Sequence, residues 1–263
     1  MSTTTKGYVD AEYLDTAAAD TQLSRVKQLT YERMHLKLGQ RILDVGCGPG
    51  TDTISLARYV GPSGQVVGVD HDPDMIAEAD QRALKAGVSA RVQHKRADAT
   101  ALPFDSNYFD ACRSERVFPH LLDPAKALSE MARVTKPGGW VVVLDPDGGS
   151  VSMDADDIES ERRLVRVFAE HMLNNGYVGR RLYRLFKEQG LAEVSVQICG
   201  FHFTDYPLAR KMWLMDKVEN EALALGVITV QELQQLHAYW EQANGDGVYF
   251  GSGHGILVSG CKL

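Results

Sequence analysis

Short runs of aliphatic residues alternate with amphipathic stretches over residues 41–146. Runs of this kind are typical of buried strands, whereas apolar positions spaced three and four apart are typical of helices. The pattern predicts strands at 41–45, 65–69, 91–94, 108–112 and 140–144, with helices at 53–60, 73–86 and 124–135 between them. Strands that alternate with helices at this spacing form a parallel sheet with helices on both faces.

The sequence on either side of this core has a different pattern. It predicts further helices at 22–36 and 158–173, and two last strands at 191–203 and 248–262. The insertion between these strands carries two amphipathic helix patterns, the second opened by a capping-box sequence from Thr229 to Glu232. We therefore expect a single domain over 1–263, with an N-terminal helical cap at 1–36, a binding core at 38–146 and a helical lid at 204–247.

Composition narrows the class of protein. Hydrophobic residues make up 44% and charged residues 24% of the chain, as in a typical globular protein. The 28 basic and 35 acidic side chains leave a net charge of −7, which argues against a nucleic-acid partner. The aliphatic runs are too short to cross a membrane, and the polar segment 1–6 differs from a secretory signal. A cytoplasmic protein without a membrane partner is therefore expected.

The cysteines give no indication of a metal site or of a disulfide framework. Cys47, Cys112, Cys199 and Cys261 lie far apart in the sequence and form no Cys-x-x-Cys pair. The acidic run at 154–159 is interpreted as the start of a helix, where negative charge is favourable. No metal is therefore expected.

A glycine-rich segment follows the first predicted strand. Gly46, Gly48 and Gly50 stand between this strand and a helix, where glycine lets a ligand approach backbone amides. The third glycine comes one residue earlier than in the dinucleotide-binding pattern. In addition, Asp44 would repel a pyrophosphate but attract an ammonium group. The segment thus favours a cationic ligand over a nicotinamide dinucleotide.

Two more carboxylates follow predicted strands. Asp70 ends the second strand, 20 residues beyond Gly50 (70 − 50), where it could accept both hydroxyls of a ribose. Asp98 follows the third strand, where a carboxylate and a backbone amide could bind an adenine edge. Together with the glycines, these carboxylates predict a nucleoside site.

In these segments the sequence resembles class I S-adenosylmethionine-dependent methyltransferases. The resemblance rests on motifs at 42–50, 67–70, 97–104, 109–110 and 137–139, which occur in the family's order. Within the class, the sequence is most similar to the small-molecule methyltransferases of the ubiquinone/menaquinone biosynthesis type. The resemblance implies an α/β fold, a Rossmann-like doubly wound sheet of seven strands with the last strand antiparallel, and the helical lid is an addition to it.

The resemblance also implies roles for individual residues. Asp44, Gly46 and Gly48 would hold the methionine half of S-adenosyl-L-methionine, Asp70 its ribose, and Asp98 with Ala99 its adenine, and S-adenosyl-L-homocysteine would be the product. The other cofactor-binding candidates are Tyr13, Arg25, Gln28, His71, Met75 and Ser114. Arg25 and Gln28 share a helix face and could reach the methionine carboxylate, or they could be solvated surface residues. Met75 could equally be an ordinary core residue.

The loop after the fourth strand is the expected acceptor side. His120 is the candidate general base, because histidine titrates near neutrality. The alternative is a structural histidine at a helix start. The substrate-binding candidates are Glu115, Arg116, Phe118, His120, Phe203 and Trp213. The loop lacks the Asn/Asp-Pro-Pro-Tyr/Phe pattern that resembles amino-methylating DNA enzymes, which disfavours methylation of a nucleobase.

The function expected from these features is methyl transfer to a small, mostly apolar metabolite by in-line displacement, in secondary or cofactor metabolism. Two alternatives stay open: an enzyme of the same fold that binds the cofactor but performs another reaction such as cyclisation, and a non-enzymatic nucleotide-binding module. Either a monomer or a homodimer is compatible with each of these functions.

Overall fold

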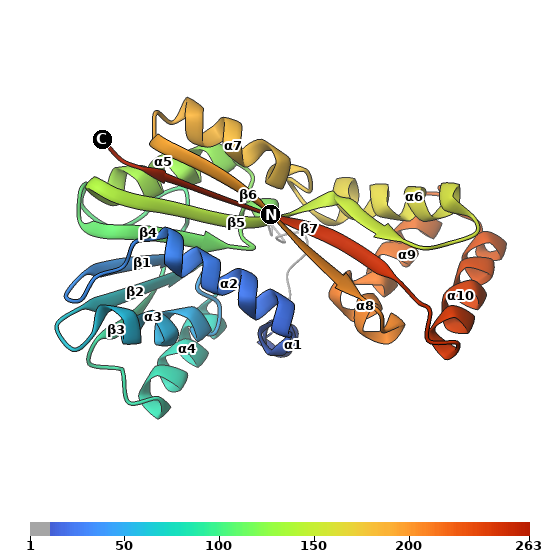
Figure 1. Ribbon diagram of the computed structural model, residues 1–263, viewed down its shortest axis with the longest axis horizontal. Coiled ribbons are helices and arrows are strands. Elements are labelled where there is room, and N and C mark those ends of the chain that lie inside the picture. The colour runs from blue at the N-terminus through green and yellow to red at the C-terminus, as the bar shows by residue number, and fades with distance from the viewer. Residues whose placement is uncertain (1–10) are drawn as a thin grey trace.

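The computed structural model describes residues 11–263, and these residues form a seven-stranded sheet with helices on both faces (Figure 1). The strand order is β3-β2-β1-β4-β5-β7-β6, and only β7 runs antiparallel to its neighbours. This confirms the doubly wound sheet with its last strand antiparallel. The strands are β1 Arg41–Val45, β2 Gln65–Asp70, β3 Val92–Arg96, β4 Phe109–Glu115, β5 Thr135–Met153, β6 Ala192–Phe203 and β7 Gly251–Cys261.

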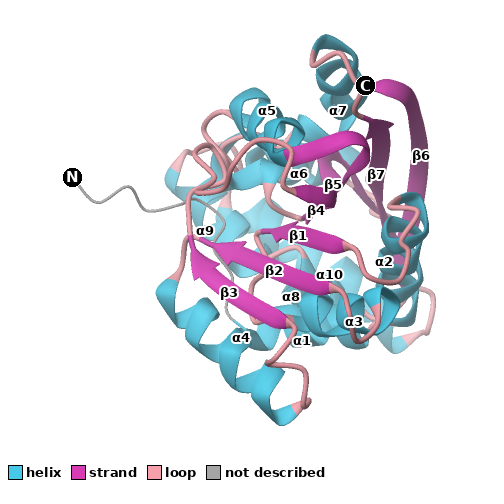
Figure 2. Ribbon diagram, turned by 90° about the vertical axis from the view of Figure 1, so that its left-hand side faces the viewer, coloured by secondary structure: helices cyan, strands magenta, loops and turns pink. Residues whose placement is uncertain are grey.

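Neighbouring residues of one strand face opposite sides of this sheet. Ile42 packs in one hydrophobic cluster with α2 Thr21–Arg33, α3 Thr51–Val60 and α4 Pro73–Lys85, whereas Leu43 packs in another with α5 Pro124–Val134 and α7 Val178–Glu188. Side chains of a strand alternate in direction, so a strand with both faces covered is apolar throughout. Figure 2 shows these helices on either side of β1, β2 and β3.

Helix α7 was not anticipated from the sequence. Its buried residues Val178, Leu182 and Phe186 recur every four positions, and arginines and a lysine fill the positions between them. The periodicity of an amphipathic helix is therefore present. The helix covers the face of the sheet that α5 leaves open next to β5 and β7.

Strand β5 is much longer than the predicted 140–144. It pairs with β4 up to Leu144 and then continues to Met153 paired with β7 alone. Strands β5, β6 and β7 therefore extend beyond the parallel sheet, and Figure 1 shows them reaching a second group of helices. These helices are α6 Ile158–Val167, α8 Tyr206–Met212, α9 Met215–Ala224 and α10 Val230–Gly245.

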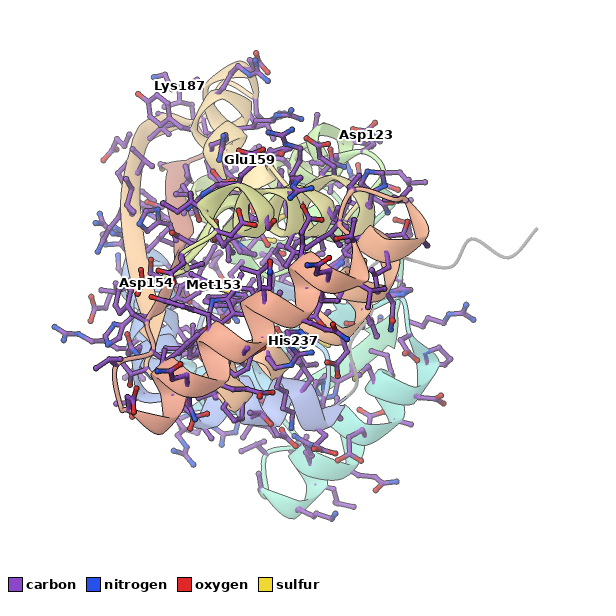
Figure 3. All side chains as sticks on the ribbon, turned by 90° about the vertical axis from the view of Figure 1, so that its right-hand side faces the viewer. Asp123, Met153, Asp154, Glu159, Lys187 and His237 are labelled. Atoms are coloured by element: carbon purple, nitrogen blue, oxygen red, sulfur yellow. The ribbon has the colours of Figure 1, made fainter. Side chains whose placement is uncertain are left out.

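The second group of helices is the predicted lid, with two differences. Its hydrophobic cluster includes α6, which lies outside the 204–247 insertion. The insertion also holds three helices, because Leu214 adopts a left-handed backbone with φ +53° and separates α8 from α9. The capping box of Thr229 and Glu232 at the start of α10 is present as predicted. In Figure 3, α10 crosses the front of this region with His237 on it.

The N-terminal region contains two helices. The predicted helix at 22–36 is α2, which begins after Asp20 accepts a hydrogen bond from the Leu23 amide and ends at Arg33. Before it lies α1 Ala11–Ala19, which packs against α2 and α8. The polar segment 1–6, and with it the first ten residues of the predicted cap, lie outside the described residues. Within residues 11–263, no helix combines the length and the apolar character that a membrane span needs.

Candidate functional site

A cavity of about 620 Å³ opens at the carboxyl ends of β1, β2 and β4. Its lining includes most of the residues that the sequence proposed for the cofactor. They are Asp44, Gly46, Gly48, Asp70, His71, Met75, Asp98 and Ala99. In an open α/β sheet, ligands bind outside the carboxyl ends of the strands, at the point where strand order reverses from the first strand. Strand β1 lies between β2 and β4 and is that point.

The glycine loop that follows β1 forms one wall of this large cavity. Gly46, Gly48 and Gly50 have φ values of +74°, +51° and +81°, a backbone conformation that favours glycine. A Cβ on Gly46 would lie 2.1 Å from a methyl carbon of Val117. Position 46 therefore requires glycine for two reasons: its φ is positive, and the loop after β4 leaves no room for a Cβ.

Asp70 braces the loop from the neighbouring strand. Its Oδ2 accepts a hydrogen bond from the Gly48 amide at 2.9 Å, and its Oδ1 accepts one from the Asp72 amide at 3.0 Å. Oδ1 also lies 3.2 Å from Nδ1 of His71, and this hydrogen bond raises the pKa of that histidine. A carboxylate offers about four lone-pair sites, and three are occupied here. Asp70 can therefore hold the loop and accept one hydrogen bond from a ligand, or two where a ligand hydroxyl replaces His71.

Asp44 meets an arginine that the sequence interpretation did not single out. Parallel pairing places Asp44 of β1 opposite Arg113 of β4, and Nη1 of Arg113 lies 3.1 Å from Oδ1 of Asp44. The second oxygen of Asp44 is buried and has no hydrogen-bond partner among the described residues. Burial raises the pKa of Asp44 to about 7, although the Arg113 guanidinium acts in the opposite direction.

Arg113 also binds two further carboxylates. Its guanidinium lies 3.2 Å from Asp52 at the start of α3 and 2.5 Å from Glu115 at the end of β4. Lys27 of α2 donates to Asp52 at 2.8 Å, and the Tyr31 hydroxyl donates to the same carboxylate. Burial alone would raise the pKa of Asp52, but Arg113 and Lys27 together hold it below its ordinary value.

These residues form a buried charge cluster, defined as Lys27, Asp44, Asp52, Arg113 and Glu115. The side chain of Arg113 is 1% exposed, so the carboxylates around it have lost nearly all of their water. A buried carboxylate without a cation costs several kcal/mol. Arg113 is therefore needed for Asp44 to remain at the cavity wall.

A smaller cavity of about 120 Å³ lies beside the large one. The two share Lys27, Glu115 and Arg116 in their linings. Most of the remaining lining is apolar and comes from α1, α2, β5, β6 and the lid, and it includes two of the substrate-binding candidates, Phe203 and Trp213. Tyr13 lines this small cavity rather than the large one, and its hydroxyl donates to the Met212 carbonyl at 2.9 Å.

The structure does not bring every predicted residue to a cavity. Arg25 and Gln28 are exposed on α2, and the Gln28 amide oxygen accepts a hydrogen bond from Tyr59. Lys27 lies on the inner side of the same helix. Ser114 and Phe118 are fully buried, and neither lines a cavity.

His120 lies at the edge of the large cavity. It belongs to the 3₁₀ turn Phe118–His120, and its carbonyl accepts a hydrogen bond from the Asn174 amide at 2.7 Å. His120 and Asn174 both line the large cavity, but neither lines the small one. Its role as a base stays a prediction.

Sequence reasoning missed four residues of the site: Lys27, Asp52, Arg113 and Asp145. A signal existed for Arg113, because an arginine in a central strand with both faces covered must find buried carboxylates. Asp145 follows the same logic, since it interrupts a run of apolar residues in β5 and is fully buried. Nothing in the local pattern around Lys27 or Asp52 marks them out.

The geometry of the large cavity fits a nucleoside that carries an amino acid. Asp44 presents a buried oxygen without a partner, which suits an ammonium group, and Asp70 lies at the end of β2 beside the glycine loop. The apolar small cavity next to it can hold a second molecule. The fold and the site together define a Rossmann-like protein with a cavity suited to a nucleoside ligand.

Comparison with known proteins agrees with this class. Residues 36–190 match the family model described as "Methyltransferase domain". The chain is 32% identical over 219 residues to an uncharacterized 37.1 kDa protein in a transposon of Streptomyces fradiae, which covers 83% of this chain and 63% of that protein. It is 30% identical over 185 residues to the ubiquinone/menaquinone biosynthesis C-methyltransferase UbiE of Escherichia coli, which covers 68% of this chain and 73% of that enzyme.

Solved structures share the fold at low sequence identity. A putative methyltransferase from Bacillus halodurans has a TM-score of 0.62 at 21% identity, over 89% of this chain and 97% of that one. The [4+2]-cyclase SpnF has a TM-score of 0.58 at 22% identity, over 92% of this chain and 81% of that one. The first curated relatives are matched over only 46% to 63% of their own length.

The chain therefore belongs to the methyltransferase domain family, and within it to the class I S-adenosylmethionine-dependent methyltransferases. S-adenosylmethionine is the cofactor of this class.

Replacing Arg113 with methionine tests the buried charge cluster. Arg113→Met removes the cation that Asp44, Asp52 and Glu115 share, and leaves Lys27 beside Asp52 and Arg116 beside Glu115. We expect the free energy of unfolding at pH 7 to fall by about 3–5 kcal/mol, measured by urea denaturation. The loss should be smaller at pH 5, because carboxylates deprived of a cation have raised pKa values and take up protons.

The control for this variant is Arg184→Met. Arg184 is 66% exposed and pairs with Glu188 on the surface of α7 at 3.7 Å. Its replacement should change stability by less than about 0.5 kcal/mol. Equal effects of the two substitutions would contradict a central role for Arg113.

Proposed function

We propose that this protein transfers a methyl group from S-adenosylmethionine to a small, mostly apolar acceptor held in the small cavity. The proposal rests on one observation: the large and the small cavity adjoin, and their linings differ in polarity. The large one has acidic groups and a glycine loop, the small one has mostly apolar walls, and Lys27, Glu115 and Arg116 line both. The reaction would take place where the two cavities adjoin.

Each part of the large cavity would hold one part of the cofactor. Asp44 would bind the ammonium group through its free oxygen, and Asp70 would accept hydrogen bonds from the ribose hydroxyls. Asp98, Ala99, His71 and Met75 would surround the adenine. When bound, S-adenosylmethionine supplies a methyl group on a positively charged sulfur. The protein's residues would then position the two reactants and exclude water.

The lid supports a small acceptor rather than a macromolecule. Phe203, Met212 and Trp213 close the small cavity from the lid side, and Leu23 and Val26 of α2 close it from the other. A cavity of about 120 Å³ has room for a ring-sized group. The cytoplasmic location and the monomeric or homodimeric state expected from the sequence remain predictions.

Transfer of labelled methyl from S-adenosylmethionine tests the proposal. We expect label in small apolar acceptors and none in bulk DNA, RNA or protein. Label in a macromolecule alone would contradict the small acceptor. Conversion of an acceptor without label transfer would favour cyclisation, the reaction named for the structural neighbour SpnF. Failure to bind S-adenosylhomocysteine would contradict the cofactor site.

Cofactor affinity should depend on pH through Asp44. Burial raises the pKa of Asp44 to about 7, so in the protein without ligand the carboxyl is largely neutral at pH 6 and largely charged at pH 8. An ammonium group binds the charged form, while the α-amino group of the ligand stays protonated below about pH 7.5. We expect the affinity for S-adenosylhomocysteine to fall about fivefold from pH 7 to pH 6, measured by calorimetry.

Asp44→Asn is the matched variant for this measurement. It should bind the ligand weakly at both pH values and lose the slope that Asp44 contributes, whereas any contribution from His71 persists. The same raised pKa has a consequence for stability. Because the folded protein holds this proton more tightly than the unfolded chain, the group destabilises the fold as pH rises from about 4 to 7. A pH dependence of affinity that is unchanged in Asp44→Asn would contradict the assignment.

His120 is tested by replacement with alanine. As a general base it would account for a loss of about 10²–10⁴ in turnover with little change in cofactor affinity. Because His120 lines the large cavity alone, we expect the loss to stay within about tenfold. A loss in the larger range, together with the disappearance of the acidic limb of the pH–rate profile, would instead establish it as the base.

A further inference from the structure

Asp145 carries a carboxyl group that the protein leaves incompletely bonded. It lies in β5 directly after Leu144, the last residue of β5 that pairs with β4, and its side chain is fully buried. Its Oδ1 accepts a hydrogen bond from the Val117 amide at 2.9 Å. Its Oδ2 has no hydrogen-bond partner among the described residues. An unsatisfied buried acceptor of this kind costs about 1–3 kcal/mol, and a bound molecule that donated a hydrogen bond to Oδ2 would remove this cost.

The other charged side chains around the small cavity already have partners within the protein. Lys27 binds Asp52, Glu115 binds Arg113, and Asp147 binds Arg180 at 2.5 Å. Arg116 lies 3.4 Å from Glu115. The hydroxyl of Tyr13 donates to a lid carbonyl. Asp145 is thus the charged residue in this lining that keeps an oxygen without a hydrogen-bond partner among the described residues.

The charges near Asp145 indicate what that molecule is. The cations Lys27, Arg113 and Arg116 are matched by the anions Asp44, Asp52 and Glu115. Burial raises the pKa of Asp145 well above its ordinary value, while the Val117 and Phe118 amides act in the opposite direction. The neighbouring charges are thus already matched, and an ionised Asp145 would balance the positive sulfur of the cofactor. An acceptor with a neutral hydroxyl keeps that balance, whereas an ammonium group would add a further charge.

From this geometry we infer that Asp145 is a catalytic residue that binds the hydroxyl group of the acceptor and takes its proton, and that the acceptor is a compact phenol or enol. The inference rests on the proposed function and specifies its acceptor. The cavity of about 120 Å³ is similar in size to an apolar cavity that holds benzene, and it adjoins the large cavity, so the part of the acceptor held in it is no larger than about one ring.

Methyl transfer to the acceptor is coupled to the loss of the hydroxyl proton. The acceptor oxygen forms its bond to the methyl carbon, the carbon–sulfur bond breaks, and its electron pair goes to sulfur. The hydroxyl proton moves to Oδ2 of Asp145, so the carboxyl must be ionised when the step begins. The positive charge of the bound cofactor favours this ionised form. The products are the methyl ether, S-adenosylhomocysteine and protonated Asp145, which returns its proton to solvent.

The test uses the full chain, labelled S-adenosylmethionine and matched pairs of small aromatic acceptors. The pairs are phenol with aniline and 4-nitrophenol with 4-nitroaniline. We expect label in the phenols and none in the amines. The variant is Asp145→Asn, which keeps an oxygen for the Val117 amide but cannot take a proton.

The two phenols separate a base from a structural residue. Phenol is neutral at pH 7.5 and needs a base, whereas 4-nitrophenol is largely ionised in solution at that pH. We expect Asp145→Asn to reduce kcat about 10²–10⁴-fold with phenol and less than tenfold with 4-nitrophenol. Equal losses with both phenols would overturn the inference, because a structural defect would not distinguish them. An unchanged kcat would overturn it as well.

Glu161→Gln is the matched control. Glu161 of α6 is 1% exposed, accepts the Met153 amide at 2.8 Å, and has its pKa raised by burial, as Asp145 does, but it lines neither cavity. We expect it to keep wild-type rates with both phenols.

Cofactor binding separates the failure of this inference from that of the proposed function. Asp145→Asn should change the Kd for S-adenosylhomocysteine less than about twofold, measured by calorimetry. If the wild-type protein binds S-adenosylhomocysteine and methylates the amines but not the phenols, the inference fails and methyl transfer stands. If it binds the ligand but labels none of the four acceptors, the phenol assignment fails. If it does not bind the ligand, the proposed function fails first.

Discussion

The site depends on one buried guanidinium. Arg113 lies in the middle of the sheet, where it faces Asp44 on the neighbouring strand and reaches Asp52 and Glu115 at the carboxyl edge. Carboxylates at this depth are tolerated only beside a cation. Arg113 therefore permits acidic groups at the bottom of a cavity that has to hold a positively charged ligand. Lys27 and Tyr31 extend the same cluster to α2 and hold that helix over the site.

The second constraint is the length of the last strands. If β5, β6 and β7 ended with the parallel sheet, the carboxyl edge would open directly to solvent. Their extension to Met153, Phe203 and Gly251 supports the lid helices beyond that edge. The small cavity lies where the sheet edge, α2 and the lid adjoin. Beyond Leu144, β5 pairs with β7 but no longer with β4. The strands therefore leave the parallel sheet there, and the small cavity lies at this point.

The distribution of polar groups between the cavities has a chemical meaning. On the cofactor side the carboxylates are paired with cations and backbone amides, and this arrangement suits a charged ligand. On the acceptor side, Asp145 is the carboxyl group that keeps an oxygen without a partner among the described residues, and its surroundings are mostly apolar. Such surroundings strengthen any single polar interaction made there. An acceptor would therefore be oriented by one hydrogen bond and held otherwise by shape.

The local sequence was sufficient to determine the core of this protein. Continuous and alternating runs of apolar residues predicted the strands. A strand covered by helices on both faces must be apolar along its length, so this pattern is visible in the local sequence. Gly46 and Gly48, with the carboxylates Asp44 and Asp70, were recognisable because the turn after β1 requires backbone conformations that glycine adopts most readily. Asp44 and Asp70 are separated in the sequence by one strand–helix–strand unit, β1–α3–β2, and this unit sets their spacing.

Only the tertiary structure decided which side chains reach the site. Lys27 rather than Arg25 or Gln28 faces inward, because the rotation of α2 is set by the packing of Tyr31 and Met34 against the sheet. The pairing of Asp44 with Arg113 depends on the register of strands 69 positions apart. The position of the Asp145 carboxyl likewise depends on the loop after β4, whose Val117 amide donates to Oδ1, and this loop is 28 residues away in the sequence. Contacts between distant segments have no signature in the local periodicity, so they had to be seen in the folded chain.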